Sequence, residues 1–253
     1  MKIYNFLAFD LGATSGRSVI GTLQDGKIEI RELTRFPNGI TTVNGKCYWN
    51  LLGLFNSIKQ GLAACAREGV MPHSIGIDTW GVDVVPLGED GSILGMPRAY
   101  RDPYTDGAPE RYFEIVPREV VYDKTGIQIM NFNTLYQIYA AVQEGYTPIV
   151  KAEKLLFMPD ALSYMLTGKA ICEYTIASTS QILNPRNGKF DESLLQAAGV
   201  SADILPEPQL PGQVIAPLCE ALADETRIGR VDVVAVAGHD TASAVAAVPA
   251  ENE

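Results

Sequence analysis

The first part of the chain consists of short apolar runs with strand spacing, separated by turn signals. Residues 4–10 are mostly apolar, and residues 18–23 form a second strand-like run after a turn rich in Gly, Ser and Thr. The hairpin signal Asp25-Gly26 then leads into a third run, residues 27–36. The pattern predicts three adjacent strands joined by short turns.

From residue 50 the apolar positions follow the period of a helix. Asn50 can cap the first turn, and Gly69 lies just past the last one. The pattern therefore predicts an amphipathic helix that begins after Asn50. The apolar positions at helical spacing are Leu51, Leu54, Phe55, Ile58 and Leu62.

After this helix the strand pattern returns. Residues 75–78 are typical of a parallel strand, and residues 82–87 and 93–96 flank the turn Asp90-Gly91 as a second hairpin. The order of strand, helix and strand predicts an alternating α/β fold.

Residues 97–211 are predicted to be mainly helical. Candidate helices are residues 134–143, 159–166 and 191–198, and the last two end at glycines.

The last part of the chain returns to an alternating pattern. Residues 205–217 carry four prolines and are predicted to be a connecting loop. Residues 231–237 indicate a buried strand, and residues 241–248 a helix of small residues.

Composition and charge exclude several classes of protein. Thirty acidic and twenty basic residues give a net charge of −10, which disfavours a nucleic-acid partner. The first eight residues lack the features of a signal peptide, and the apolar runs are far shorter than the roughly 20 residues of a spanning helix. We therefore expect a cytoplasmic protein with no membrane partner, in which phosphate is held locally by backbone amides or a metal.

The four cysteines give no pattern of metal ligands or disulfides. None of them has C-x-x-C spacing, which argues against zinc and against a disulfide framework. Buried free thiols are the expected state, and a pair between Cys65 and Cys219 is the alternative.

The first candidate site lies at the end of the first predicted strand. A strand that stops on Asp10 and turns through glycines and hydroxyls presents donors to an anion, while the carboxylate can hold Mg²⁺. The spacing is not that of a Walker motif. The alternative interpretation is a hairpin turn whose glycines only supply backbone freedom.

The second candidate site lies between two strand-like runs. Carboxylates and an indole at a strand end suit a polyol, because acids accept hydroxyl protons and an aromatic ring covers the C–H face of a sugar. Alternatively, Trp80 belongs to the core and Asp78 caps a turn.

The third candidate site follows the late buried strand. Asp240 lies on a turn of small residues, where it can accept a hydroxyl proton from a substrate at the sheet end. The alternatives are that Asp240 caps the next helix and that His239 is a hydrogen-bonded core histidine.

In this order along the chain, the three sites resemble the FGGY family of carbohydrate kinases, within the actin, hexokinase and Hsp70 superfamily. The resemblance covers the whole chain, and four motifs together are similar to the members that act on L-rhamnulose. These are residues 78–83 (DTWGVD), 132–137 (FNTLYQ), 158–160 with 166–168 (MPD, LTG), and 239–244 (HDTASA).

The resemblance implies one α/β domain with a ribonuclease H-like sheet and a helical insertion. It also implies phosphoryl transfer from MgATP to the C1 hydroxyl of the ketose L-rhamnulose, with ATP and Mg²⁺ as cofactors. It makes Asp240 the catalytic base and Asp10 the acid that organises Mg²⁺.

The same resemblance assigns the phosphate loop and the sugar contacts. The implied ATP phosphate loop is Ala13, Thr14, Ser15, Gly16 and Arg17. The implied sugar contacts are Gly81, His239, Asp240 and Thr241, and residue chemistry adds Trp80, Asp83 and Asn133.

Members of this family continue into a second domain that supplies the adenine pocket. We therefore expect residues 1–253 to be the amino-terminal, sugar-binding half, with the carboxy-terminal ATP-binding domain absent and the isolated half inactive.

Two rival functions remain open. Another FGGY kinase, for xylulose or fuculose, would share Asp10 and Asp240 but would not be expected to carry residues 78–81. A non-catalytic sugar-binding module of the same fold would need no general base at Asp240.

Overall fold

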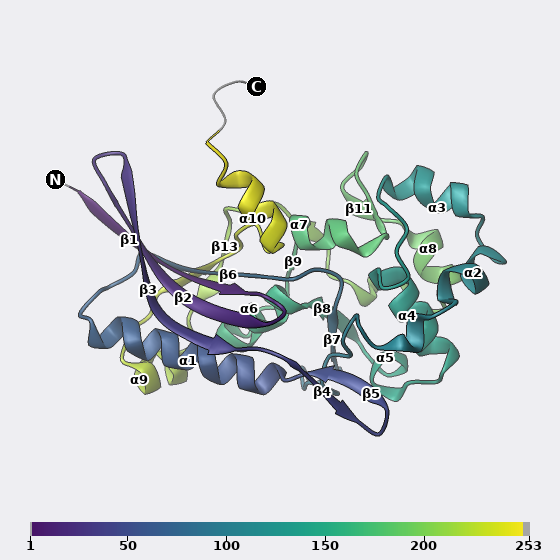
Figure 1. The fold of residues 1–253 in the computed structure, drawn as a ribbon, viewed down its shortest axis with the longest axis horizontal. Helices are drawn as coiled ribbons and strands as arrows, with labels where there is room; N and C mark the ends of the chain where they lie inside the picture. Colours follow the sequence, from purple (N-terminus) through teal and green to yellow (C-terminus); the bar gives the residue numbers. More distant parts are fainter. Residues whose placement is uncertain (1, 250–253) are drawn as a thin grey trace.

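The computed structural model of the protein describes residues 2–249 and is built around one twisted sheet (Figure 1). The sheet has six strands. In their order across the sheet, the strands are β13 (Val214–Pro217), β14 (Asp232–Val234), β6 (Ser74–Thr79), β1 (Ile3–Leu11), β2 (Ser15–Gln24) and β3 (Lys27–Pro37). An antiparallel meander continued by parallel strands is the ribonuclease H-like arrangement, so the predicted fold class is confirmed.

The first five strands include two tight hairpins of the same kind, between β2 and β3 and between the next two strands. Asp25 and Gly26 both have positive φ, of 51° and 74°, which matches the twist of β2 and β3. Asn44 and Gly45, with φ of 50° and 76°, join β4 (Ile40–Val43) to β5 (Lys46–Trp49) in the same way. The sequence pattern predicted the first hairpin and missed the second.

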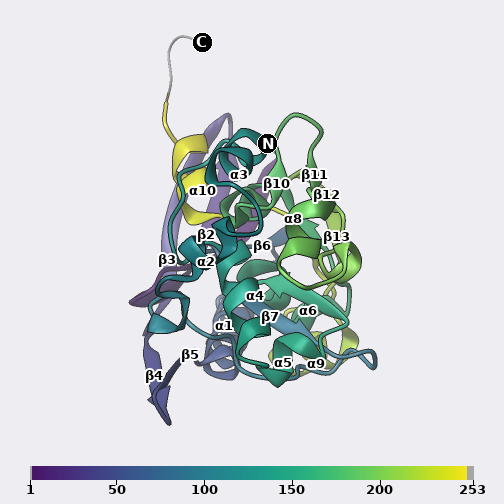
Figure 2. The same ribbon diagram turned by 90° about the vertical axis from the view of Figure 1, so that its right-hand side faces the viewer.

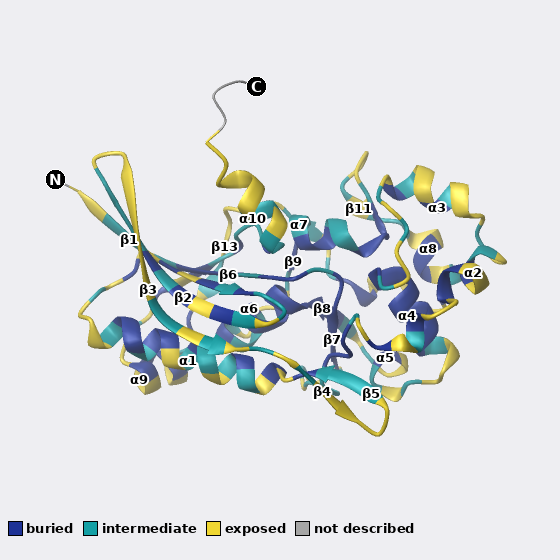
Figure 3. Ribbon diagram, viewed as in Figure 1, coloured by how far each residue is buried: buried dark blue, intermediate teal, exposed yellow. Residues whose placement is uncertain are grey.

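Three helices cover one face of the sheet, namely α1 (Leu51–Arg67), α6 (Met158–Thr167) and α9 (Glu220–Thr226) (Figure 1). Phe9 of β1 packs so closely on α1 that only a glycine fits at position 61, where a Cβ atom would lie 2.5 Å from its ring. The short helix α10 (Asp240–Ala246) lies on the other side of the sheet and has no buried residue (Figure 3).

Between β6 and β13 the chain forms a largely helical insertion, which faces the viewer in Figure 2. It has a second apolar core that is separate from the core beneath the sheet. Its helices are α2 (Ala108–Phe113), α3 (Arg118–Thr125), α4 (Thr134–Gln143), α5 (Thr147–Val150), α7 (Tyr174–Ala177) and α8 (Glu192–Ala197). Its short strands are β7 (Val84–Leu87), β8 (Lys154–Phe157), β9 (Cys172–Glu173), β10 (Leu183–Asn184), β11 (Lys189–Phe190) and β12 (Pro208–Gln209).

Two predictions of secondary structure were wrong. Residues 93–96 do not form a strand: Ile93 makes only an isolated bridge to Leu87, although the local turn keeps the hydrogen bond from the Leu94 N–H to the Pro86 carbonyl. The full-length partner of β7 is β8, which no local pattern indicated. Residues 205–217 are not only a loop, since they contain β12 and the edge strand β13. Only residues 232–234 of the predicted strand 231–237 pair in the sheet.

All four cysteines are free, so the alternative pair between Cys65 and Cys219 is wrong. Cys65 and Cys172 are buried, as expected, whereas Cys47 and Cys219 are partly exposed. No helix within residues 2–249 is long and apolar enough to cross a membrane.

The first turn of α1 provides a test of the cap that the sequence predicted. The side chain of Asn50 accepts a hydrogen bond from the Gly53 N–H at 2.9 Å. We expect Asn50→Ala to lower the free energy of unfolding by about 1 kcal/mol, because this N–H loses its acceptor. Asn50→Asp keeps an acceptor oxygen and should stay close to the parent in a urea titration. Equal losses in the two variants would contradict a capping role.

Candidate active site

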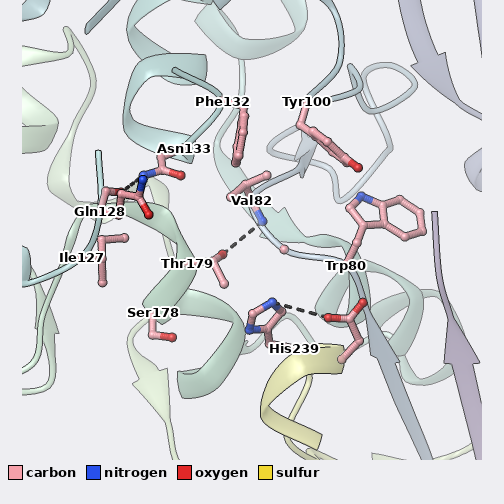
Figure 4. A pocket seen from close by; sticks show the side chains of 12 residues that line it. Trp80, Val82, Tyr100, Ile127, Gln128, Phe132, Asn133, Ser178, Thr179 and His239 are labelled. Carbon is pink, nitrogen blue, oxygen red and sulfur yellow. Dashed lines mark hydrogen bonds and ion pairs between the residues drawn. The ribbon is translucent and has the colours of Figure 1, made fainter. Parts of the chain in front are cut away.

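A cavity of about 530 Å³ lies where the carboxyl end of β6 meets the helical insertion (Figure 4). Segments that are far apart in the sequence form its walls. They contribute Trp80, Gly81 and Val82 after β6, Tyr100, then Ile127, Gln128, Phe132 and Asn133 before α4, Ser178 and Thr179 after α7, and His239 and Asp240 after β14.

Most of the predicted sugar-binding residues line this cavity. Trp80, Gly81, Asn133, His239 and Asp240 are all in its walls. The amide nitrogen of Asn133 already donates to the carbonyl of Gln128 and to the side chain of Gln181. Two predicted contacts, Thr241 and Asp83, are not among the residues that form the wall.

Asp240 is the first residue of α10, and its side chain remains 38% exposed. Its Oδ1 atom accepts hydrogen bonds from the N–H and the hydroxyl of Thr241, at 2.6 and 3.1 Å. No donor within residues 2–249 reaches Oδ2. Because Oδ1 binds the adjacent residue and not the second or third N–H of the helix, Asp240 is not a simple N-cap.

The ring of His239 lies beside this carboxylate, with Nε2 3.5 Å from Oδ1 of Asp240 (Figure 4). Burial lowers the pKa of His239 below its ordinary value, and the negative charges of Asp240 and Glu173 oppose this only in part. The neutral ring can donate or accept one hydrogen bond at the cavity wall.

The turn after β6 is strained. Val82 has a φ of 70°, which is unfavourable for a β-branched residue. The N–H of Asp83 donates to the carbonyl of Gly81 at 2.9 Å, so the three residues form the rare kind of γ-turn. The Val82 N–H donates to Thr179 Oγ1 at 3.1 Å, and the Val82 carbonyl accepts from Thr134 Oγ1 at 2.7 Å. These bonds from the insertion hold a conformation that costs on the order of 1–3 kcal/mol.

Asp83 lies behind the cavity wall and is 1% exposed. Its Oδ2 atom accepts from the indole N–H of Trp49 at 2.5 Å, from that of Trp80 at 3.0 Å and from the Tyr100 N–H at 3.2 Å. Its Oδ1 atom accepts from Gln137 at 2.9 Å. Burial raises the pKa of Asp83 to about 6, although all four donors favour the charged form. The carboxylate thus orients two aromatic walls of the cavity without facing it.

The predicted phosphate loop is the turn between β1 and β2 together with the first residues of β2. Asn38 fixes the turn, because its N–H donates to the Thr14 carbonyl at 3.0 Å and its side chain to the Gly12 carbonyl at 2.9 Å. Arg17 pairs with Asp10, with Nη2 2.7 Å from Oδ2. A side chain at Gly16 would collide with the ring of Phe36, so packing alone accounts for this glycine.

Asp78 belongs to the DTWGVD motif of the second candidate site, but the resemblance assigns it no role. It lies opposite Asp10 in the parallel register of β1 and β6, and its buried Oδ1 atom has no hydrogen-bond partner within residues 2–249. Burial raises the pKa of Asp78 to about 7, and the negative charges of Asp10 and Asp240 add to this effect. In the sequence, the only sign that Asp78 could belong to the site was that Asp10 and Asp78 each lie near the end of a predicted strand.

A divalent cation fits these carboxylates on electrostatic grounds, since it would relieve their repulsion and supply a partner for the orphaned oxygen. Among the described residues no group of three or more His, Cys, Asp and Glu side chains is arranged to hold a metal. Mg²⁺ usually binds through one or two carboxylates, substrate phosphates and water.

A sequence-family model described as the amino-terminal domain of the FGGY family of carbohydrate kinases matches residues 5–247. This chain belongs to the FGGY family. The resemblance seen in its motifs is confirmed.

Curated relatives of this FGGY chain include two enzymes named rhamnulokinase. The one from Bacteroides thetaiotaomicron is 50% identical over 246 residues, which are 97% of this chain and 51% of the relative. The one from Ligilactobacillus salivarius is 42% identical over 253 residues, 100% of this chain and 51% of the relative. The chain thus spans about half the length of these relatives.

Two solved kinase structures share the fold. A gluconate kinase from Lactobacillus acidophilus has a TM-score of 0.83 at 17% identity, covering 93% of this chain and 48% of its own. A xylulose kinase from Rhodospirillum rubrum has a TM-score of 0.84 at 16% identity, covering 96% of this chain and 51% of its own. At these identities the likeness shows the fold alone.

The pKa of Asp83 can be read through tryptophan fluorescence in this FGGY chain, because both of its tryptophans donate to the same carboxylate oxygen. We expect an emission change centred near pH 6, the value to which burial raises the pKa of Asp83. This folded-state pKa lies above the ordinary value of 3.8. Between these two pH values, Asp83 is therefore protonated in the folded protein and ionised in the unfolded chain. The contribution of Asp83 to the free energy of unfolding is therefore greatest at low pH and falls as the pH rises from 3.8 towards 6.

Asp83→Asn should abolish this emission change, whereas Asp224→Asn on the exposed face of α9 should leave it intact. The same transition in Asp83→Asn would assign the titration to another group.

Proposed function

We propose that this chain forms the sugar-binding half of an ATP-dependent kinase that phosphorylates L-rhamnulose at its C1 hydroxyl. The observation that carries the proposal is the position of Asp240, a partly exposed carboxylate with an uncommitted Oδ2 atom at the wall of the cavity. Sequence identity of 40% or more to several rhamnulokinases favours this ketose over xylulose and fuculose.

The walls of the cavity suit a deoxy-ketose. Trp80, Tyr100 and Phe132 offer aromatic faces for C–H groups and a methyl group, while His239 and Thr179 offer polar atoms for hydroxyls. In this proposal Gly81 shapes the backbone turn at the cavity wall. Thr241 orients Asp240 through its two hydrogen bonds to Oδ1. Asp83 contributes by orienting Trp80 and Tyr100.

In the proposed reaction Asp240 accepts the proton of the C1 hydroxyl. The C1 oxygen forms a bond to the γ-phosphorus of ATP, the bond from that phosphorus to the β–γ bridging oxygen breaks, and ADP leaves with the electron pair. Such a transfer depends on positioning and on charge stabilisation more than on covalent chemistry by the protein. A carboxylate placed beside the acceptor hydroxyl is therefore a sufficient base.

ATP and Mg²⁺ are assigned to the edge of the sheet beside the cavity. Asp10, with Asp78 next to it, would hold Mg²⁺, which supplies neutralising charge at the phosphates. The backbone of residues 13–16 and the side chain of Arg17 are proposed to contact the phosphates. The Arg17–Asp10 pair would then adjust as the nucleotide binds.

The nucleoside pocket is proposed to belong to the other half of the relatives' length. The exposed position of α10, whose Val245 is 69% exposed, is consistent with a surface that meets that half. Domain closure would then bring the γ-phosphate to the acceptor hydroxyl and exclude water. On this proposal, the chain alone binds the ketose but does not turn over ATP.

We expect Asp240→Asn to lower kcat by at least ~10²-fold while ketose affinity is largely kept, because the variant cannot accept the hydroxyl proton. The measurement is a coupled ADP-release assay with L-rhamnulose, on a chain of the relatives' full length that contains these residues. Asp224→Asn, an exposed change on α9, is the matched control. Turnover within a factor of about three of the parent would remove Asp240 from the role of base.

We expect Asp10→Ala to raise the Mg²⁺ concentration needed for half-maximal activity and to leave ketose binding nearly unchanged. The reason is that Asp10 lies on the phosphate turn, outside the walls of the sugar cavity. Titrating Mg²⁺ against activity, with calorimetry of L-rhamnulose binding in parallel, separates the two effects. A lost ketose affinity with an unchanged Mg²⁺ response would contradict the assignment.

A further inference from the structure

Glu173 is a buried carboxylate that the proposed mechanism does not use. It lies in β9 of the insertion, is 1% exposed and forms no ion pair within residues 2–249. A buried charge without a counter-ion is strongly unfavourable unless hydrogen bonds replace its water. The hydrogen bonds that Glu173 accepts therefore indicate what the residue does.

Three of these bonds are local, and one connects to a distant part of the chain. The carboxylate accepts from the Thr175 N–H at 2.8 Å, from the Thr175 hydroxyl at 2.6 Å and from the Ile176 N–H at 3.1 Å, all in the first turn of α7. Its Oε2 atom also accepts from the Gly238 N–H at 3.0 Å, 65 residues further along the chain. Gly238 is two residues before Asp240.

A second bond joins the same two segments. The N–H of His239 donates to the hydroxyl oxygen of Thr175 at 3.3 Å, while that hydroxyl donates to Glu173. Glu173 thus holds the backbone before Asp240 both directly and through Thr175.

A side chain at Gly238 would be crowded at this contact. A Cβ atom there would lie 3.1 Å from Glu173 Oε2 and 3.2 Å from Pro159 Cγ. On its other side, the Gly238 carbonyl accepts from the Thr79 N–H at 2.9 Å, at the end of β6. The backbone at Gly238 is therefore fixed between the sheet and the insertion.

We propose that Glu173 is a positioning residue for the catalytic base: it fixes the backbone of residues 238–239 against α7, so that Asp240 and His239 face the cavity. The proposal rests on the proposed role of Asp240. It also links the base to the opposite wall, since α7 continues into the turn that carries Thr179, the residue that binds the strained backbone of Val82.

The MPD motif fits into this arrangement. Asp160 of α6 is 2% exposed, and its carboxyl oxygens lie 3.2 and 3.3 Å from the Glu173 N–H. Burial raises the pKa of Asp160 well above its ordinary value, and its carboxyl group supplies acceptors for the backbone of β9.

A purely local role would make Glu173 only the N-cap of α7. The two roles predict opposite orders for two substitutions. Glu173→Asp keeps a charge and is a good cap but is too short to reach Gly238. Glu173→Gln keeps the length, so its amide oxygen can still accept from Gly238, but its NH₂ group opposes the Thr175 N–H.

The ring of His239 provides a readout that needs no substrate. The chain has two histidines, and His73 lies against Tyr4 and Phe6, so it serves as an internal reference. In NMR spectra of the imidazole groups, we expect Glu173→Asp to shift the His239 resonances clearly and those of His73 hardly at all. Glu173→Gln should remain closer to the parent. Glu192→Asp, an exposed glutamate in the first turn of α8, is the matched control.

In the enzyme of full length we expect Glu173→Asp to lower kcat by about 10-fold or more, because a displacement near 1 Å at a reacting group costs up to 10²-fold. Glu173→Gln should lower kcat less. An unshifted His239 and an unchanged kcat in Glu173→Asp, or a larger effect of Glu173→Gln, would overturn the proposal in favour of a capping role.

If Glu173→Asp fails to fold, Thr175→Val tests the same connection through the single bond to the His239 N–H. We expect it to shift His239 and lower kcat, and unchanged values would overturn the proposal. Failure of the parent to phosphorylate L-rhamnulose would refute the proposed function, whereas the His239 resonances would still test the positioning role.

Discussion

The parallel pairing of β1 with β6 determines where the chemically active groups meet. Its register sets Asp10 opposite Asp78, and a single further bridge sets His239 beside Thr79 at the end of the same strand. Because parallel strands end at the same edge of a sheet, carboxylates from three distant segments come together there. Burial raises the pKa of Asp78, and the negative charges of Asp10 and Asp240 add to this effect, which makes this edge suited to a cation and to phosphate.

The second constraint is the attachment of the insertion to the sheet. The two apolar clusters meet at β7 and β8, whose side chains alternate between them. Buried carboxylates add directional contacts around the cavity. Asp83 joins the aromatic walls to α4 through Gln137, and Glu173 joins α7 to Gly238. Hydrogen bonds are directional, so they define the geometry of the cavity more sharply than apolar contact would.

Local signals in the sequence predicted much of this fold, and the failures share one cause. Helices with clear periods and caps, such as the one after Asn50 and the one ending at Gly168, were found because their determinants lie within a few residues. The strand predicted at residues 93–96 did not form, because only Ile93 bridges back to Leu87 after the local turn, while β7 pairs along its whole length with β8 in the register Val85–Leu156 and Leu87–Lys154. The sequence pattern indicated the local turn but not this distant partner.

The residues of the candidate site also fall into two groups: those that local motifs predicted, and those whose role depends on distant contacts. Asp240, His239 and Trp80 stood at strand ends in motifs, so their type and position were informative. The role of Asp83 depends on Trp49 and Gln137, and that of Glu173 on Gly238, which no local pattern brings together. Asp83 was therefore predicted as a sugar contact when its geometry is that of a support behind the wall.

The strained backbone of Val82 lies in the wall of the cavity. The other described non-glycine residues with positive φ are Asp25, Asn44, Gln181 and Arg227, none of them β-branched, whereas Val82 at the cavity is. A glycine at position 82 would remove that strain, as would a turn of another type.

Hydrogen bonds from the insertion keep this strained backbone in place, and they come from Thr134 and Thr179. Since the same insertion holds Gly238 through Glu173, it contacts both the turn at Val82 and the backbone before Asp240. A change in the position of the insertion would therefore move both sides of the cavity at once.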